Sequence, residues 1–257
     1  MWQIGVLILI LLIFLSAPYV IGPARVYCNQ RFRIPAEIVH IEPCEQALPD
    51  PIRMHFAECY ESLAKLGFDL VGVFGLPKLV PNVQSISAFY MNRRTNVVSN
   101  TSFVMSAAAV VRYVEFVTRY KDGTVVQTNN CAEIGAFPTP AHVHTLQFWD
   151  IQEVATLHDL HRFHEARHQK SPPINRLDDE FGGNLERYIA VAAMDEVCAR
   201  QLETGYLVDC SGGYRPTLKG AVIMTWQLLW PFKAIRKSRR QRNAEQLLGE
   251  FRALHPL

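Results

Sequence analysis

The longest apolar stretch of the chain lies at its start. Residues 1–22 carry no charged side chain, and the run from Ile4 to Leu15 is almost wholly aliphatic. About 20 such residues in a helix match the roughly 30 Å hydrocarbon core of a bilayer. A cleaved signal peptide is the alternative, but no basic residue precedes the run, and Pro18 follows the only small pair, Ser16-Ala17. We therefore predict a transmembrane anchor over residues 1–22.

Charge next to this run predicts its direction. Arg25, Arg31 and Arg33 follow it closely, whereas only the terminal amine precedes it. Basic residues flanking an apolar helix stay on the cytoplasmic side. The sequence thus predicts a single-pass membrane protein with its N-terminus outside and its folded domain in the cytoplasm.

After residue 22 the sequence pattern predicts first an extended segment, then a helix, and then a series of strands. Four prolines between residues 23 and 50 predict an extended juxtamembrane linker. A helix is predicted over 51–66, with Pro51 in its first turn and Gly67 after its end. Runs rich in Val, Phe, Tyr and Thr, separated by turn residues, predict strands at 68–76, 83–92, 96–105, 110–120, 124–130 and 142–149.

Short connections between these runs favour antiparallel pairing. Asp122-Gly123 supplies the positive φ values of a tight hairpin, and parallel pairing would need a crossover of roughly a dozen residues or more. Helical patterns return at 151–168, 176–204 and 216–250. A β-meander with helices before and after it is an α+β fold, predicted here as one domain over residues 51–215.

The C-terminal part, residues 216–257, contains a second apolar segment. Residues 220–232 carry no charge and include Trp226 and Trp230, at i and i+4 on a predicted helix. A basic run follows directly, with Lys233, Arg236, Lys237, Arg239 and Arg240. Thirteen residues are too short to cross a bilayer, so one hypothesis is an amphipathic helix lying on anionic headgroups. The alternative is that the tryptophans pack on the domain and the basic run is a solvated helix.

Composition narrows the classes of protein. The net charge of +2 predicts no general attraction to nucleic acid, and the hydrophobic fraction of 49% is enough to bury a core. The six cysteines include no Cys-x-x-Cys pair. This spread favours reduced thiols over a zinc knuckle or a disulfide framework.

Histidines are concentrated just after the predicted strands. His158, His161, His164 and His168 would share one face of the helix predicted there. Residues 164–168 read His-Glu-Ala-Arg-His, which matches the H-E-x-x-H pattern. In that pattern two imidazoles one turn apart bind Zn²⁺, and the glutamate acts as general base on the metal-bound water.

This short segment resembles the zincin metallopeptidases. The resemblance implies His164 and His168 as metal ligands and Glu165 as the catalytic base. The segment departs from the family at Arg167, where zincins usually carry an uncharged residue, and at Pro172-Pro173, which end the helix early. A third ligand could come from Asp178, Asp179, Glu180, Glu186 or Glu196, and the sequence does not choose among them.

Two functions therefore stand as hypotheses. The first is a membrane-anchored, non-catalytic binding module that requires no cofactor and meets the bilayer, anionic headgroups and a protein partner of unknown identity. The second is a membrane-anchored zinc hydrolase. Without zinc chemistry, the histidines would belong to a surface helix whose imidazoles are solvated, paired with nearby acids such as Asp159, or buried singly with satisfied ring nitrogens. A further alternative is a pH-responsive or loosely metal-binding histidine face, because imidazole titrates near neutrality.

Overall fold

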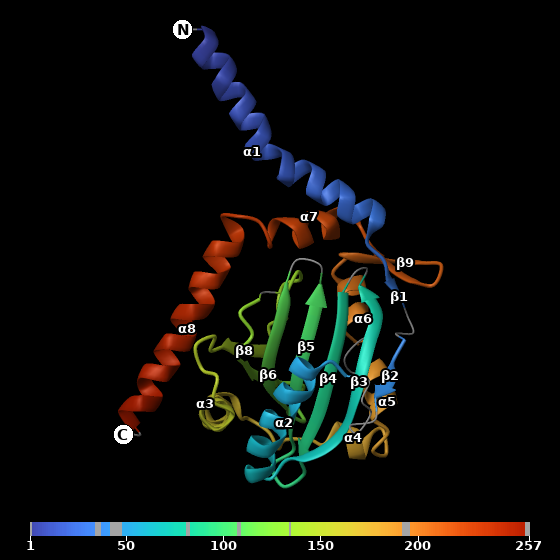
Figure 1. Cartoon of the computed structure of the whole chain (residues 1–257), viewed down its shortest axis with the longest axis vertical. Coiled ribbons are helices and arrows are strands. Elements are labelled where there is room, and N and C mark those ends of the chain that lie inside the picture. Colours follow the sequence, from blue (N-terminus) through green and yellow to red (C-terminus); the bar gives the residue numbers. More distant parts are fainter. Residues whose placement is uncertain are drawn as a thin grey trace.

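A computed structural model describes residues 2–33, 37–41, 48–80, 83–106, 109–133, 135–191 and 196–254. The side chains of residues 8–13, 33 and 78–80 lie outside this description. One large sheet forms the centre of the molecule, with helices on both of its faces, and a long N-terminal helix projects from one end (Figure 1). The α+β fold class is thus confirmed.

The large sheet has seven strands in the order β2-β3-β4-β5-β6-β7-β8. Each predicted strand is present, and neighbouring strands from β2 to β7 pair antiparallel. The last pair, β7 and β8, is parallel, because residues 130–142 give the chain enough length to cross back to the same end of the sheet. The strands are β2 (Val39–Ile41), β3 (Asp69–Val80), β4 (Val83–Asn92), β5 (Val97–Ser106), β6 (Val110–Arg119), β7 (Val125–Asn129) and β8 (Val143–Gln147).

One face of this sheet, which we call the helix-covered face, carries the main core. Helices α2 (Asp50–Lys65) and α3 (Val154–His168) pack on it, and α8 (Phe232–Leu254) lies beside α3 and β8. Leu63, Phe116 and Leu157 are fully buried where these elements meet. Burying such a side chain contributes roughly 1.5–3 kcal/mol, so this face holds the domain together.

The opposite face carries shorter helices. Phe74 points away from the main core and packs with Leu177, Tyr188 and Ile189. These residues lie in and just after α4 (Arg176–Asp179) and α5 (Leu185–Tyr188). Helix α6 (Glu196–Glu203) follows them in the chain. The prediction of one continuous helix over 176–204 is therefore wrong, because Gly182 and Gly183 both adopt positive φ and turn the chain.

A second, smaller sheet was not predicted. Strand β1 (Phe32–Arg33) pairs with β10 (Gly213–Pro216), which forms a hairpin with β9 (Leu207–Cys210). The predicted linker over 23–50 is thus only partly extended. Its first residues belong to a helix, β1 belongs to the small sheet, and β2 belongs to the large sheet. No disulfide joins the cysteines within the described ranges.

The predicted helix over 216–250 is also wrong as a single element. Helix α7 (Leu218–Trp226) ends before α8 begins, with Pro231 between them. Proline cannot donate the backbone hydrogen bond that a continuous helix needs. Trp226 is the last residue of α7, and Trp230 lies outside it, so the two tryptophans do not share the helical face that their spacing predicted.

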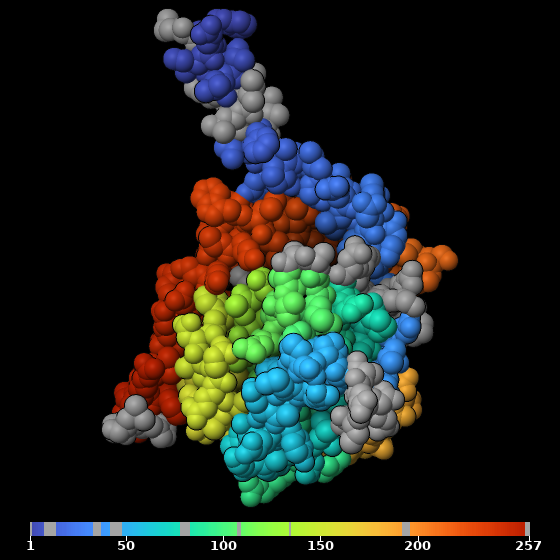
Figure 2. Space-filling view, viewed as in Figure 1, coloured from blue at the N-terminus to red at the C-terminus, as the bar shows by residue number. Residues whose placement is uncertain are grey.

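Helix α1 (Trp2–Asn29) packs its C-terminal half against α7, where Figure 2 shows the blue residues lying on the orange ones. Figure 1 shows the helix projecting from there away from the domain. Contact is close at Gly22, where an added Cβ would lie 2.5 Å from Thr225 Cγ2. Trp226 Nε1 also donates to the carbonyl of Tyr19 at 3.0 Å. Considering the described residues alone, which leave out the side chains of 8–13, no helix is both long and apolar enough to cross a membrane.

Candidate functional site

The histidine helix α3 lies across the helix-covered face with its imidazoles directed at the strands. His161 is 0% exposed and His164 2% exposed. Apolar Leu157 and Leu160 on the same face anchor the helix in the main core. Because residues three and four apart share a helical face, the packing that buries these leucines also buries the histidines.

Two threonines on neighbouring strands form hydrogen bonds with these imidazole rings. Thr118 Oγ1 on β6 lies 2.9 Å from His161 Nε2, and Thr128 Oγ1 on β7 lies 3.0 Å from His161 Nδ1. The Thr128 hydroxyl also lies 3.1 Å from His164 Nδ1. A hydroxyl both donates and accepts, so Thr118, His161, Thr128 and His164 form one continuous hydrogen-bonded chain between α3 and the sheet.

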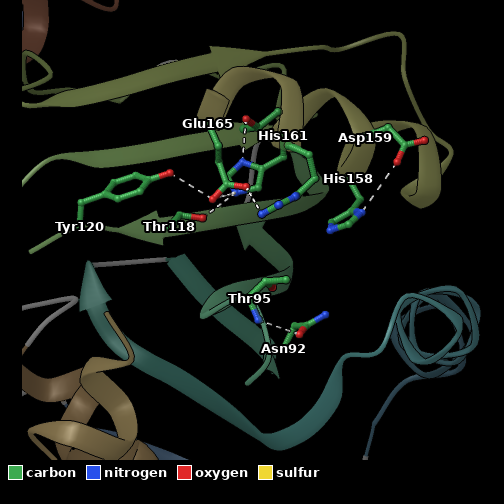
Figure 3. A network of polar contacts seen from close by, with 10 residues as sticks. Asn92, Thr95, Thr118, Tyr120, His158, Asp159, His161 and Glu165 are labelled. Carbon is green, nitrogen blue, oxygen red and sulfur yellow. Dashed lines mark hydrogen bonds and ion pairs between the residues drawn. The ribbon is translucent and has the colours of Figure 1, made fainter. Parts of the chain in front are cut away.

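Glu165 is held from two sides. The Tyr120 hydroxyl donates to Oε1 at 3.2 Å, and the Arg162 guanidinium donates to Oε2 at 2.7 Å (Figure 3). Glu165 is 4% exposed, and burial together with the Glu165 charge raises the pKa of Tyr120. Both oxygens of the Glu165 carboxylate thus have donors.

Burial keeps the imidazoles neutral. Desolvation lowers the pKa of His161 well below 6.5, and lowers that of His164 to about 3 with help from the charges of His168 and His144. Glu165 Oε1 lies 3.9 Å from His161 Nε2, but an uncharged ring forms no ion pair with it at neutral pH. Each imidazole therefore offers one donor and one acceptor, which matches the threonine hydroxyls.

His158 behaves differently from its neighbours. It packs edge-on to Phe68, with ring centroids 5.6 Å apart, and tilted against Phe116. Neither of its ring nitrogens has a hydrogen-bond partner in the part of the chain that the structure describes, and Asp159 lies 4.0 Å away. Desolvation lowers its pKa despite the opposing charge of Asp159.

The H-E-x-x-H residues lie together, as a helix requires. His164 and His168 are edge-to-face with ring centroids 5.1 Å apart, and His144 from β8 stacks on His168 at 3.8 Å. Among the described residues, no three His, Cys, Asp or Glu side chains form a group that could hold a metal ion. Zinc binding by this segment stays a prediction.

The acidic residues considered as third ligands have other surroundings. Glu180 and Glu196 both pair with Arg176 at 2.7 Å, and Asp178 pairs with Arg93 at 2.9 Å. Asp179 and Glu186 are exposed. All five lie in or beside α4, α5 and α6, which follow α3 in the chain, and α4 and α5 pack on the opposite face of the sheet from α3.

The predicted membrane-contact residues divide into two groups. Trp230 is 76% and Trp226 39% exposed. By contrast, most of the basic residues contact the domain: Lys233 pairs with Glu133 at 3.1 Å, Arg236 donates to the carbonyl of Gly135, Arg240 donates to Gln147 and Thr139, and Lys237 lies over the Trp149 ring. Arg239 is exposed.

Sequence reasoning singled out the histidines but missed Thr118 and Thr128. Both are inward-facing polar residues. The alternation of burial along β6 could have found Thr118, whereas β7 has no such alternation to mark Thr128. No family model matches the chain, and comparisons with curated proteins and with solved structures found no match either.

Proposed function

We propose that this protein is a membrane-anchored, non-catalytic binding module whose domain sits at the cytoplasmic face of the bilayer. The observation that carries the proposal is the packing of α1 on α7. It joins the uncharged N-terminal segment to the exposed aromatic side chains at the junction of α7 and α8.

The exposed side chains support this arrangement. Trp226, Trp230 and Phe232 lie at the junction of α7 and α8, and each is at least 39% exposed. Trp226 stacks on Phe232 at 5.9 Å and contacts Tyr19 of α1 edge-on at 6.3 Å. Aromatic residues with one polar edge favour the headgroup region of a membrane, so α7 would lie on the surface that α1 enters.

Charge supports the orientation. Arg25 and Arg31 fall at the end of α1 nearest the domain, and residues 1–22 contain no charge. Basic residues in this position favour the cytoplasmic side for everything that follows. Because the basic residues of α8 are mostly engaged with the domain, the aromatic cluster rather than the basic run is assigned the lipid contact.

The non-catalytic part of the proposal rests on Glu165. In an H-E-x-x-H enzyme this carboxylate must be able to take a proton from water. Here Tyr120 and Arg162 bind both of its oxygens, and its side chain is 5% exposed.

Membrane attachment and orientation are tested on the full-length chain in bacterial cells. We expect the protein to stay with membranes that are washed in high salt and in alkaline carbonate. A reporter enzyme that works only in the cytoplasm should be active when it is fused after Leu257. A reporter that works only after export should be inactive at the same position. Release by either wash, or activity only of an exported reporter, would overturn the proposal.

The lipid contact of α7 is tested by quenching with brominated lipids. In vesicles, Trp230→Phe should remove a substantial part of the quenchable tryptophan fluorescence. Trp149→Phe is the matched control, because Trp149 lies under Lys237 on the domain. Equal losses in the two variants would place the α7–α8 junction away from lipid.

A further inference from the structure

The opposite face of the sheet bears a cleft of about 400 Å³. Strands β6, β7 and β8 form its floor, residues 131–133 and 135–140 and helix α6 form its walls, and Arg240 of α8 reaches into it. Glu115, Gln127 and Thr145 line the floor. Their strand positions alternate with those of Thr118, Thr128 and His144, so the cleft and the histidine helix lie on opposite sides of the sheet.

The cleft is preorganised by hydrogen bonds. Asn129 Nδ2 donates to Glu115 Oε1 at 3.1 Å. Gln147 Nε2 donates to the carbonyls of Cys131 and Glu133, both at 3.0 Å, and Arg240 donates to Gln147 Oε1. The wall over 131–133 is therefore tied to the floor, and a ligand would meet fixed polar groups.

Two groups on α6 have unused bonding capacity. Gln201 is 6% exposed, and its Oε1 is buried without a hydrogen-bond partner among the residues that the structure describes. The neighbouring Arg200 also lines the cleft, and within the described ranges no hydrogen bond or ion pair of its guanidinium is found.

The charges in the cleft are of both signs. Glu115 on the floor is an acid whose pKa is raised by desolvation, against the opposing effects of Asn129 and Arg119. Arg200 and Arg240 supply guanidinium groups. Glu133 also lines the cleft, but Lys233 pairs with it. A complementary ligand thus needs one anionic group for a guanidinium and one cationic donor for the Glu115 carboxyl.

We propose that this cleft binds a small zwitterion of the amino-acid class. The ligand's carboxylate would pair with Arg200, and its ammonium would donate to Glu115. The volume lies within the range of roughly 300–1,000 Å³ that small-molecule pockets occupy. The inference rests on the proposed binding role, but it does not depend on membrane attachment.

The experiment uses the full-length protein in detergent and ligand-observed saturation-transfer NMR. The probes are the standard L-amino acids, with acetate, methylamine and glycerol as single-function probes. We expect saturation transfer to at least one amino acid and much weaker transfer to the three others. The affinity for that amino acid should fall at least tenfold in Arg200→Gln and in Glu115→Gln.

Arg187→Gln is the matched control, since Arg187 is an exposed arginine outside the cleft, and it should bind as the parent does. Circular dichroism and thermal melting establish that each variant is folded. Absence of transfer to every amino acid, equal transfer to the single-function probes, or unchanged affinity in both cleft variants would overturn the inference. The membrane washes that test the proposed attachment give their result independently of this binding experiment, so the two proposals can fail separately.

Discussion

Thr128 Oγ1 lies 3.0 Å from His161 Nδ1, and the same hydroxyl serves His164 at 3.1 Å. A single strand residue thus satisfies two buried imidazoles. We expect Thr128→Val, which keeps the shape of the side chain, to leave two ring nitrogens unpaired and to lower the free energy of unfolding by about 2 to 5 kcal/mol.

Denaturant unfolding followed by circular dichroism measures this change. Thr118→Val, which leaves one nitrogen of His161 unpaired, should cost about 1 to 3 kcal/mol. Thr145→Val on the opposite face is a control, because its hydroxyl is partly exposed and bonds only Gln127 among the described residues. A smaller loss in Thr128→Val than in Thr118→Val would contradict the shared role of the hydroxyl.

Stability should also depend on pH through the buried histidines. The folded-state pKa values of His161 and His164 lie below their ordinary 6.5, so the unfolded chain binds protons more readily than the folded one. Above about pH 6.5 both imidazoles are mostly neutral in the unfolded chain as well as in the folded one. The free energy of unfolding falls as the pH drops below this value, because the unfolded chain then binds protons and the folded chain does not.

Between about pH 7 and about pH 5, each of the two histidines should remove roughly 2 kcal/mol from the free energy of unfolding. Denaturant titrations across this range measure the slope. His164→Gln should flatten it by about half, whereas a slope unchanged in that variant would show that other groups cause the pH dependence.

The strands of the large sheet could be predicted from the sequence because each has a local signal. Asp122-Gly123 gives the hairpin between β6 and β7, with Gly123 at φ 84°, and alternation gives the strands on either side. The parallel pairing of β8 depends instead on the length of the crossover and on which edge of the sheet is open. Local patterns do not carry that information.

The helices after residue 170 were predicted less well because tertiary contacts, and not the local sequence, determine where they begin and end. The break at Gly182-Gly183 allows Leu177 and Tyr188 to reach Phe74 together, and a straight helix could not bring both to one aromatic side chain. Strand β1 forms only because β9 and β10, far away in sequence, present an edge to it. Two residues have no periodicity by which such a strand could be predicted.

The candidate site, too, could be predicted from the sequence only in part. The spacing of the four histidines placed them on one helical face, which is confirmed. The two threonines that bond them lie on β6 and β7, and one donor to Glu165, Tyr120, follows β6, so the helical motif could not indicate them. The cleft that contains Glu115 requires residues from six separate segments. Only the fold brings these together.

Zinc content distinguishes the binding module from the hydrolase. Because Tyr120 and Arg162 bind Glu165, and the acidic candidates for a third ligand are engaged or exposed elsewhere, we expect less than stoichiometric zinc in protein purified without chelators. Elemental analysis measures this. One zinc per chain that is lost in a His164→Ala, His168→Ala double variant would establish the enzyme instead.

Two glycines in the C-terminal helices provide a test of how α7 is seated. Gly220 lies so close to the backbone of Tyr206 that an added Cβ would overlap its carbonyl, whereas Gly249 in α8 has nothing within 4 Å of such a Cβ. Backbone atoms cannot move aside as a flexible side chain can, so Gly220→Ala must displace α7 from the β9 hairpin. Overpacking of this kind costs roughly 1–3 kcal/mol.

Gly249→Ala is the matched control. Alanine is favoured over glycine in a helix by about 1 kcal/mol, so this variant should be as stable as the parent or more so. The melting temperature should therefore fall in Gly220→Ala and should not fall in Gly249→Ala. If Gly220→Ala melted at the parent temperature, the close approach of α7 to Tyr206, and with it the position of the aromatic junction beside α1, would be wrong.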